Sequence, residues 1–527
     1  MRAITIAAAL CAACTHAPPP HGGPRPLAIV GATVVFPERD TGTTLGDATV
    51  VIAGDRITAV GPRASTPVPD GAAVLDGKGR WLIPGMVDGH VHFFQSGNLY
   101  TRPDAADFTA LVPYAQEVAR NKARLPATFA VWLASGVTSV IDVGGPFWNF
   151  AVRDAAMASE SAPRVETTGP LISMVARPQL ELDDPPIIKV ESAEAARTLV
   201  ARELPHHPDF IKVWFIHREG EDLAAQEAIV AATAAAAHAA HVRLAVHATE
   251  LETAKAAVRA GADYLVHNVF DEPIDDELVQ MILAHHVLVC PTLFVTTGYP
   301  LALSNQWQAT PDEQRLADPQ ILTAMHDLDH IPTDKLPPRV ARLVAEKRTV
   351  PPPTVAMQNL AKLEAAGVTI VMGTDAGNIG TLHGPSVFRE MALMRDAGLT
   401  PLQVLRSATT NGAKAMGRDD LGAIAPGKLA DLVLLDADPL ADVANLSHAV
   451  RVVKGGVVYD PKALEHERGG RWSRLRPRLT AMFPPGCASE PARPRSIEMR
   501  VAAGRSQRPS LETQGISRPD REMSHMR

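Results

Sequence analysis

The chain has 527 residues, a formal net charge of −7 and a pI near 6.3, and 46% of its residues are hydrophobic. This length suits one large barrel with an accessory domain, and the composition can bury a large core. The acidic balance excludes a general nucleic-acid binder, which would carry a basic footprint. Of the four cysteines, Cys11 and Cys14 lie in the first 14 residues, Cys290 lies in an expected strand and Cys487 near the C-terminus, so neither a disulfide framework nor a thiolate metal cluster is expected.

Residues 1–14 have the layout of a secretion signal, because one arginine precedes a short apolar run that ends in small residues and Cys14. Ala12-Ala13-Cys14 resembles the end of a bacterial lipoprotein cleavage box. This predicts an exported protein in the periplasm or a lipoprotein anchored to the membrane through Cys14. Cleavage by an ordinary signal peptidase and an uncleaved cytosolic start remain alternatives. Residues 15–26, rich in Pro, Gly and His, are interpreted as a flexible linker.

From residue 27 the pattern changes to short β-rich segments separated by Gly and Asp. The expected strands span residues 27–36, 49–52, 57–60 and 73–76. They are too few for half a barrel, so residues 27–84 are predicted to form part of a small β-domain.

The sequence I-P-G-M-V-D-G-H-V-H-F-F occupies residues 83–94. Pro84-Gly85 begins a new element, and the apolar residues after it predict a buried strand that ends at His90 and His92. Side chains two residues apart on a strand face the same side, so both imidazoles would point to one place. Two such histidines can also form an ordinary polar face, because catalytic zinc usually has three protein ligands. The metal interpretation therefore depends on the rest of the chain.

The middle of the chain alternates short strands with Ala-rich helical stretches, which predicts repeated βα units and a parallel sheet. The clearest helices are at residues 222–240, 251–260 and 276–285. The expected strands span residues 86–93, 137–143, 165–171, 210–215, 243–248, 264–268, 288–293 and 369–374. Eight such units predict an α/β fold with a (β/α)8 TIM barrel at residues 85–415, whose active site lies at the C-terminal ends of the strands.

Six polar residues lie near those strand ends: His90, His92, Lys212, His247, His267 and Asp375. Each lies in an otherwise apolar strand, where an unpaired polar group costs free energy. Taken singly, each has an ordinary explanation, such as a core histidine with a partner, a helix-capping aspartate or a lysine that reaches solvent. Their convergence on one barrel mouth favours a shared site.

With these residues in order, the chain resembles the amidohydrolase superfamily, close to its imidazolonepropionase-like and prolidase-like or dipeptidase-like members, over about residues 27–460. S-A-T-T-N-G-A at residues 407–413 and the run at residues 421–436 carry the same resemblance. It implies that residues 416–460, with strands at 431–435 and 450–459, join residues 27–84 in one composite β-sandwich domain beside the barrel. Residues 461–527, rich in Arg, Pro, Ser and Glu, are predicted to be a disordered tail.

The resemblance implies a binuclear site with two divalent metal ions, for which Zn²⁺ suits the nitrogen and oxygen donors. His90, His92 and Asp375 would hold one ion, His247 and His267 the other, and carboxylated Lys212 would bridge them. A hydroxide from a metal-activated water would attack an amide, peptide, cyclic amide or ester, with Asp375 as general base and then acid.

Two alternatives remain open. If Lys212 only packs, the site is mononuclear, as in an imidazolonepropionase-like hydrolase or deaminase. His90, His92, His247 and Asp375 would then be the ligands, and His267 would contact the substrate. The other alternative is a catalytically inactive barrel that serves as a surface-binding lipoprotein. Such a barrel should have lost ligands, and this chain keeps all six.

Substrate contacts are expected from the loops at the barrel mouth. The candidates are Trp214 and His217, which follow Lys212, and His383 in T-L-H-G-P-S, with ordinary loop packing as the alternative. Residues 295–368 form a long segment before the eighth strand and are expected to build a lid or a substrate pocket. The expected partner is a small molecule or a dipeptide. The number of subunits, including a homo-oligomer, is left open.

Overall fold

The structure is a computed structural model, and it describes residues 25–467. The expected leader at residues 1–14 lies outside the described residues, as do most of the expected linker and most of the expected C-terminal tail. The first residues of that tail are described, and they form the helix α15 (Pro461–Glu467). Within residues 25–467, no helix is both long enough and apolar enough to cross a membrane.

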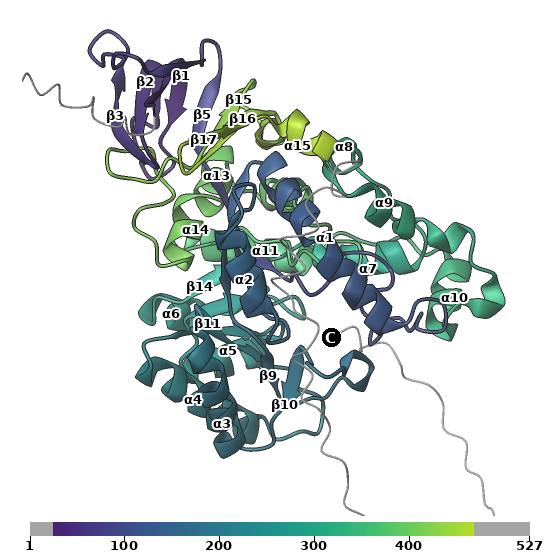
Figure 1. The fold of residues 1–527 in the computed structure, drawn as a ribbon. Helices are drawn as coiled ribbons and strands as arrows, with labels where there is room; N and C mark the ends of the chain where they lie inside the picture. The colour runs from purple at the N-terminus through teal and green to yellow at the C-terminus, as the bar shows by residue number, and fades with distance from the viewer. Residues whose placement is uncertain (1–24, 468–527) are drawn as a thin grey trace, which may run out of the picture.

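Strands from both ends of the described chain form one eight-stranded sheet, seen at the top of Figure 1. The strands are β1 (Leu27–Val35), β2 (Thr44–Ala53), β3 (Arg56–Pro62), β4 (Ala73–Asp76), β5 (Trp81–Pro84), β15 (Leu432–Leu435), β16 (Ala449–Lys454) and β17 (Val457–Tyr459). β5 joins the two groups, because it pairs in parallel with β1 and antiparallel with β15. Apolar side chains from both groups, including Ile29, Val50, Leu82 and Leu432, share one buried cluster.

The expected strand at residues 450–459 is divided into β16 and β17. Gly455 and Gly456 both have a positive φ, a conformation that glycine adopts without steric cost. They reverse the chain, so that β16 and β17 pair antiparallel.

Seven parallel strands and one irregular segment form the barrel. The strands are β6 (Met86–Val91), β7 (Val137–Asp142), β8 (Arg164–Thr167), β11 (Phe210–Trp214), β12 (Arg243–His247), β13 (Tyr264–Val266) and β14 (Leu288–Cys290). They pair in two runs, β6-β7-β8 and β11-β12-β13-β14, and the N–H of Asp209 donates to Thr167 O across the gap at 2.9 Å. Apolar side chains such as Val87, Phe210 and Tyr264 fill one buried cluster.

Residues 369–374, expected as the eighth strand, do not form a regular strand. Within this segment only Ile370 makes an isolated bridge, to Val289, and Ala376 just after it bridges to Val91; these two bridges close the barrel between β14 and β6. Close packing contributes to the irregularity. A Cβ atom on Gly373 would lie 2.4 Å from the sulfur of Cys290, so the backbone approaches its neighbour closely here.

The expected third strand, residues 165–171, is also divided. β8 ends at Thr167, and β9 (Leu171–Ser173) begins only after Gly169 and Pro170. Gly169 has a φ of 84°, and Pro170 has no N–H to donate, so the ladder is interrupted between them. β9 instead pairs with β11 and with β10 (Ile187–Lys189).

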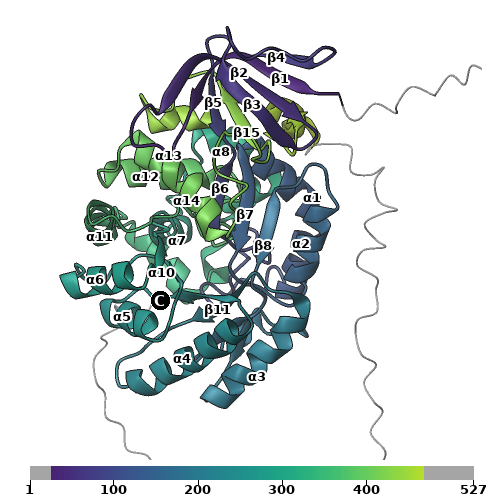
Figure 2. The same ribbon diagram turned by 90° about the vertical axis from the view of Figure 1, so that its left-hand side faces the viewer.

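Helices surround the strands of the barrel (Figure 2). They are α1 (Tyr114–Ala134), α2 (Asn149–Met157), α3 (Ala193–Glu203), α4 (Leu223–Ala239), α5 (Leu251–Arg259), α6 (Asp276–Ala284), α11 (Thr354–Ala365), α12 (Ser386–Asp396), α13 (Pro401–Ser407) and α14 (Thr410–Ala415). Side-chain caps fix where several begin. Ser192, Asp222 and Asp275 each accept a hydrogen bond from the backbone N–H three residues later. The bounds of α4, α5 and α6 differ from the expected bounds by a single residue at each changed end.

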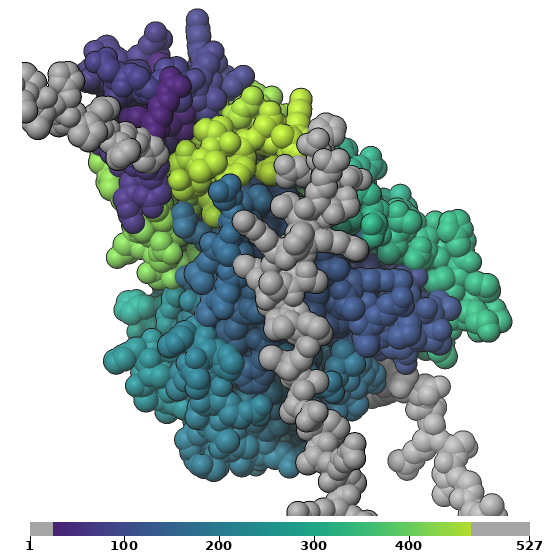
Figure 3. Space-filling view, viewed as in Figure 1, coloured from purple at the N-terminus to yellow at the C-terminus, as the bar shows by residue number. Residues whose placement is uncertain are grey.

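Two long connections at the barrel mouth pack together into a cap, which we define as residues 95–113 and 291–353. Its helices are α7 (Val295–Leu303), α8 (Pro311–Leu316), α9 (Pro319–Met325) and α10 (Pro338–Glu346). In Figure 3 the two parts adjoin as indigo and green surfaces. A separate buried cluster joins them, with Leu99 and Phe108 from one part and Trp307, Leu328 and Val340 from the other. The expected lid segment thus supplies most of the cap and also the barrel helix α11.

Candidate metal centre

β6 and the residue after it bring His90 and His92 to the mouth of the barrel. Both side chains are buried, and their Nε2 atoms lie 3.3 Å apart. Residues two apart on an extended strand face the same side, which explains why the imidazoles converge. His92 Nδ1 donates to Gly144 O at 2.7 Å, so Nε2 is the ring nitrogen that faces the site and can ligate a cation.

Asp375 reaches the same place from the segment that closes the barrel. Its Oδ1 lies 3.2 Å from His90 Nε2 and 3.1 Å from His92 Nε2. The backbone N–H of Asp375 donates to His90 O at 2.7 Å, which fixes the segment against β6. Asn378 Nδ2 donates to Asp375 Oδ1 at 2.7 Å, which holds the carboxylate in this orientation.

These three donor atoms fit a shared cation. Ligands at about 2.0–2.1 Å from a tetrahedral zinc ion lie about 3.3 Å from one another, by the geometry of a tetrahedron. The separations among His90 Nε2, His92 Nε2 and Asp375 Oδ1 are 3.1 to 3.3 Å. The donor types also match, because imidazole nitrogen and carboxylate oxygen are ordinary zinc ligands.

His247, His267 and Lys212 form the other side of the site. The ring centroid of His267 lies 4.4 Å from that of His247 and 4.8 Å from that of His90. Lys212, on β11, is only 1% exposed. Neither its Nζ nor His247 Nε2 has a hydrogen-bond partner among residues 25–467. Buried polar atoms are almost always paired, so two unpaired atoms beside a cluster of donors indicate a bound group.

Burial sets the protonation of these donors. Desolvation lowers the pKa of His90 and of His247 well below the usual value, and it lowers the pKa of His267 to about 3. The three imidazoles are therefore neutral and can offer lone pairs to a metal. Burial also lowers the pKa of Lys212 to about 7, so much of its amine is uncharged near neutral pH.

For Asp375, unlike the histidines, other interactions outweigh the effect of burial on the pKa. Burial alone would raise the pKa of its carboxyl, but the hydrogen bond and the charge of His92 outweigh burial and hold the pKa below its usual value. The side chain is therefore ionised at neutral pH, as both a metal ligand and a proton acceptor require.

A second buried carboxyl fixes the strand that carries His90. Asp88 accepts hydrogen bonds from the backbone N–H of His90 at 3.1 Å and from that of Thr374 at 3.0 Å. The hydroxyl of Thr374 adds a third bond at 2.6 Å. Asp88 thereby fastens β6 to the closing segment directly beneath the candidate ligands.

His267 is held from behind in a similar way. Its Nδ1 lies 2.6 Å from Thr292 Oγ1, in the loop after β14. The next two residues, Leu293 and Phe294, donate their backbone N–H groups to the buried carboxyl of Glu390, each at 2.8 Å. Glu390 thus anchors the loop that presents Thr292 to His267.

Three residues at the site have backbones in the left-handed region. The φ angles are 80° for His267, 61° for Asp375 and 43° for Thr292. Non-glycine residues adopt this region rarely, at a cost of about 1–3 kcal/mol each when strained, and such residues cluster at functional sites. Their coincidence with the donor cluster favours a functional site here.

Comparison with known proteins decides the family. Residues 81–459 match the family model described as the amidohydrolase family. The chain belongs to the amidohydrolase family. Over 410 residues it is 27% identical to imidazolonepropionase of Streptomyces coelicolor, an alignment that covers 74% of this chain and 86% of that protein.

Solved structures share the fold of this amidohydrolase. A prolidase complexed with N-methylphosphonate-L-proline is 25% identical, with a TM-score of 0.61, and the match covers 82% of this chain and 99% of that one. A Xaa-Pro dipeptidase with methionine bound in its active site is 21% identical, also with a TM-score of 0.61, and the match covers 82% and 100%. The family identifies this protein as a metal-dependent hydrolase of C–N bonds. It leaves the substrate and the number of ions open.

Two of the expected substrate contacts follow Lys212. Trp214 lies at the site, because its ring centroid is 5.9 Å from that of His247. His217 Nδ1 lies 2.8 Å from the side-chain oxygen of Gln226 on α4. Contact of either residue with substrate stays a prediction. Trp214 is better placed for such a contact than His217.

His383, the third expected contact, is buried behind the site. Its ring stacks on Phe93, with centroids 5.6 Å apart, and meets Trp132 edge-on at 5.8 Å. Its Nε2 lies 3.2 Å from His92 O. The imidazole therefore supports the backbone of a candidate ligand, and its contact with substrate stays a prediction.

Three residues outside the predicted site orient Asp375, and of these only Tyr299 was considered from the sequence, as a residue lining a pocket. Arg102 Nη1 and Tyr299 Oη both donate to Asn378 Oδ1, at 2.8 and 2.6 Å. This leaves Asn378 Nδ2 to donate to Asp375. Asn378 follows Asp375 by three residues, so its position was a usable signal. Arg102 and Tyr299 come from the two separate parts of the cap, and no local pattern relates them.

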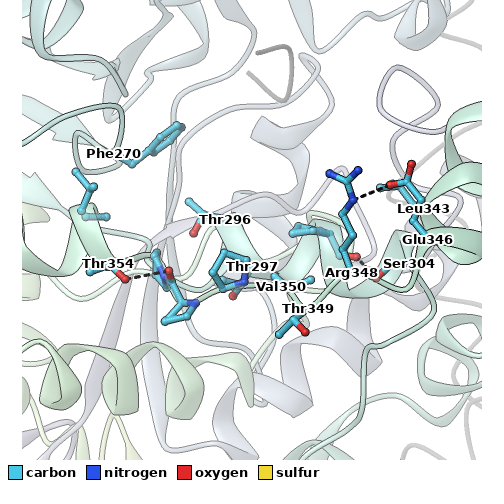
Figure 4. Close-up of a pocket in the computed structure, with 16 residues that line it drawn as sticks. Phe270, Thr296, Thr297, Ser304, Leu343, Glu346, Arg348, Thr349, Val350 and Thr354 are labelled. Carbon is cyan, nitrogen blue, oxygen red and sulfur yellow. Dashed lines mark hydrogen bonds and ion pairs between the residues drawn. The ribbon is translucent and has the colours of Figure 1, made fainter. Parts of the chain in front are cut away.

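A cavity of about 550 Å³ lies among α7, α10, the start of α11 and Phe270 in the loop after β13 (Figure 4). Its lining is mainly apolar and includes Phe270, Thr296, Val350, Pro352 and Ala356. None of the six candidate ligands lines it. Asn268, which directly follows His267, donates from Nδ2 to Ala356 O at 2.7 Å. The cavity is therefore a neighbour of the metal centre at the rim of the barrel mouth.

Proposed function

We propose that this amidohydrolase hydrolyses the C–N bond of an amide, peptide or cyclic amide at two divalent cations, with zinc the best match to the donors. The observation that carries the proposal is the approach of His90 Nε2, His92 Nε2 and Asp375 Oδ1 to within 3.1–3.3 Å of one another. The unpaired nitrogens of Lys212 and His247 support it.

His90, His92 and Asp375 would hold one cation, and His247 and His267 the other. The neutral amine of Lys212 would attack carbon dioxide, forming an N–C bond and releasing one proton. The resulting carbamate would be an anionic oxygen ligand for the cations. Cations held here would lower the pKa of a water molecule and polarise the carbonyl oxygen of the substrate.

Asp375 would move the proton. Its Oδ1 faces His90 and His92, and its Oδ2 lies 4.0 Å from His267 Nε2, so the carboxylate faces both groups of donors. It accepts the proton of the attacking water and gives it to the leaving nitrogen as the C–N bond breaks. The products are a carboxylic acid and an amine. Asn378 keeps the carboxylate in place during both transfers.

A mononuclear site is the second candidate. His90, His267 and Asp375 lie close enough to hold one ion, a set that differs from the expected mononuclear ligands His90, His92, His247 and Asp375 because His267 is a ligand in it. In that arrangement Lys212 would remain an uncharged buried amine. The number of ions bound per chain separates the two forms.

The experiment is hydrolysis of a substrate panel by the metal-loaded protein. The panel contains dipeptides, N-acyl amino acids, lactams and lactones, and released amines or acids are quantified by mass spectrometry. We expect turnover of at least one compound with a C–N bond. Asp375→Asn should lower kcat at least 10²-fold, because general acid–base catalysis contributes about 10²–10⁴-fold. Turnover by Asp375→Asn equal to that of the wild-type protein would show that Asp375 does not carry the proton.

A further inference from the structure

Arg177 lies in the loop after β9, beside the metal centre. Its guanidinium carbon lies 4.6 Å from the ring centroid of Trp214, and the side chain is 16% exposed. Trp214 in turn lies next to His247, with ring centroids 5.9 Å apart. A planar guanidinium over an aromatic face is held in orientation by the cation–π attraction. Arg177 is therefore a fixed positive charge one side chain away from the candidate ligands.

A second set of contacts leads from Arg177 to the same centre. Arg177 Nε lies 3.4 Å from Asp104 Oδ2. Asp104 also accepts two bonds from Arg102, each at 2.7 Å, and Arg102 Nη1 donates to Asn378, which holds Asp375. The two routes approach the site through His247 and through Asp375. Arg177 is thus linked through intervening side chains to both groups of donors.

Arg102 and Arg177 differ in whether a guanidinium nitrogen remains free to bind another group. Arg102 makes a bidentate pair with Asp104 and uses its remaining nitrogen on Asn378. Arg177 has only the longer contact to Asp104 and a bond from Nη1 to the backbone oxygen of Ala176 at 3.1 Å. Its Nη2 makes no hydrogen bond within residues 25–467. One carboxylate shared between two guanidiniums leaves the cluster with a net positive charge, which favours an additional anion.

We propose that Arg177 binds a carboxylate of the substrate, so that the enzyme selects amides whose amine part is an amino acid. The inference deepens the proposed function and rests on it for the position of the scissile bond. An α-carboxylate lies about one residue length, roughly 3.5 Å, beyond the scissile amide. A substrate of this form spans from the donor cluster toward Trp214 and Arg177. The guanidinium then acts as a specificity-determining residue and takes no part in proton transfer.

The test is equilibrium binding of two inert compounds, measured by titration calorimetry on the metal-loaded protein. 4-Oxo-4-phenylbutanoate has the shape of N-benzoylglycine, with CH₂ in place of the amide N–H, so it cannot be hydrolysed. 1-Phenylpentane-1,4-dione replaces its carboxylate by a neutral acetyl group. We expect wild-type protein to bind the acid at least tenfold more tightly than the dione. Arg177→Met should reduce this ratio to less than threefold, and Arg177→Lys should retain part of it.

Arg197→Met is the matched control, because Arg197 is a surface arginine on α3 paired with Glu194. It should leave the ratio unchanged. A wild-type protein without preference, or an Arg177→Met protein that keeps a tenfold preference, overturns the inference. The result is separate from catalysis. Loss of preference in Arg177→Met without turnover of any amide would support the anion site and contradict the proposed hydrolysis. Turnover of an amide by a wild-type protein that shows no preference for the acid would support the proposed hydrolysis and contradict the anion site.

Discussion

At the scale of single residues, two of the candidate ligands are held by groups that do not face the cations. His92 Nδ1 donates to Gly144 O, and His267 Nδ1 lies 2.6 Å from Thr292 Oγ1. Such partners fix the tautomer and the ring orientation of a ligating histidine. The left-handed φ of 43° at Thr292 shows that the chain accepts an unfavourable backbone to place this hydroxyl.

Thr292→Val tests this support. Valine keeps the shape and the β-branching of threonine, so the backbone strain is matched, but the partner of His267 is lost. Removal of such a partner typically costs 10–100-fold in metal affinity, and we expect a loss of that size in competition with a chelator. Thr297→Val is the control, because the Thr297 hydroxyl donates only to the backbone oxygen of Phe294. Unchanged affinity in Thr292→Val would show that the contact is incidental.

His383 predicts a pH dependence of stability. Burial lowers its pKa to about 4 in the folded protein, below the ordinary value of 6.5. The unfolded chain therefore binds a proton first as the pH falls, and the free energy of unfolding decreases between pH 6.5 and 4. The loss is at most about 3 kcal/mol. In denaturant titrations across this window, His383→Gln should give a flatter profile, and exposed His285→Gln should keep the wild-type slope. A wild-type slope in His383→Gln would exclude this cause.

The sequence was informative about the ligands and much less so about their supports. Lys212 and His247 could be singled out because each interrupts an apolar strand. Asn378 was a usable signal, since it follows Asp375 by three residues. Thr292 lies in a loop, where polar residues are ordinary, and its role depends on a backbone turn that no local pattern specifies. Arg177 was missed for the same reason, because only the fold brings its loop to Trp214.

At the scale of elements, the segment that closes the barrel is the least regular part of the site. It carries Asp375 and touches β6 through the N–H of Asp375, which donates to His90 O. Gly373 lets the backbone approach, since an added Cβ atom would meet Cys290 Sγ at 2.4 Å and the backbone nitrogen of His90 at 2.8 Å. The backbone nitrogen of His90 cannot move aside without a shift of the main chain of β6.

Gly373→Ala should therefore push the closing segment away from β6. We expect a lower melting temperature together with a lower metal content per chain, because the segment carries Asp375 and contacts His90. Gly46→Ala is the matched control, since nothing lies within 4 Å of the added atom and its φ is not positive. Wild-type stability and metal content in Gly373→Ala would mean that the closing segment tolerates displacement.

The predicted helices and strands were correct where the hydrophobic periodicity of the sequence was strong. They were wrong where tertiary packing determined the backbone conformation. The helices α4, α5 and α6 were placed to within one residue at each end, because the Ala-rich patterns of α4 and α5, the apolar pattern of α6 and the caps are local signals. The eighth strand is predicted as a strand by its composition, yet residues 369–374 make only one isolated bridge, between Ile370 and Val289. Gly169-Pro170, within the expected third strand V-E-T-T-G-P-L, was a usable signal of the break between β8 and β9.

At the scale of the whole molecule, Asp431 ties the composite sheet to the barrel. Its carboxylate accepts two bonds from Arg164 on β8, at 2.8 and 3.1 Å, and one from the backbone N–H of Gly455 at 2.7 Å. Its own backbone oxygen accepts from Gly85, the residue between β5 and β6, at 2.7 Å. One residue thus connects sheet strands from both ends of the chain to the third strand of the barrel.

Asp431→Ala should lower the free energy of unfolding by roughly 3–5 kcal/mol, because it leaves a partly buried arginine without its partner. The expected change is a loss of cooperativity or a shifted midpoint in urea, with the metal ligands untouched. Asp436→Ala is the control, because Asp436 is exposed and pairs only with the exposed His448. A wild-type midpoint for Asp431→Ala would show that the sheet and the barrel are held together elsewhere.

The number of metal ions per chain tests the central claim most directly. It can be measured by inductively coupled plasma mass spectrometry on protein purified without chelators from zinc- or manganese-supplemented cells. The account predicts two ions per wild-type chain and the loss of at least one in Lys212→Ala. One ion in both proteins would reject the bridging lysine and leave the mononuclear form. A wild-type protein that binds no divalent ion under any of these conditions would contradict the account.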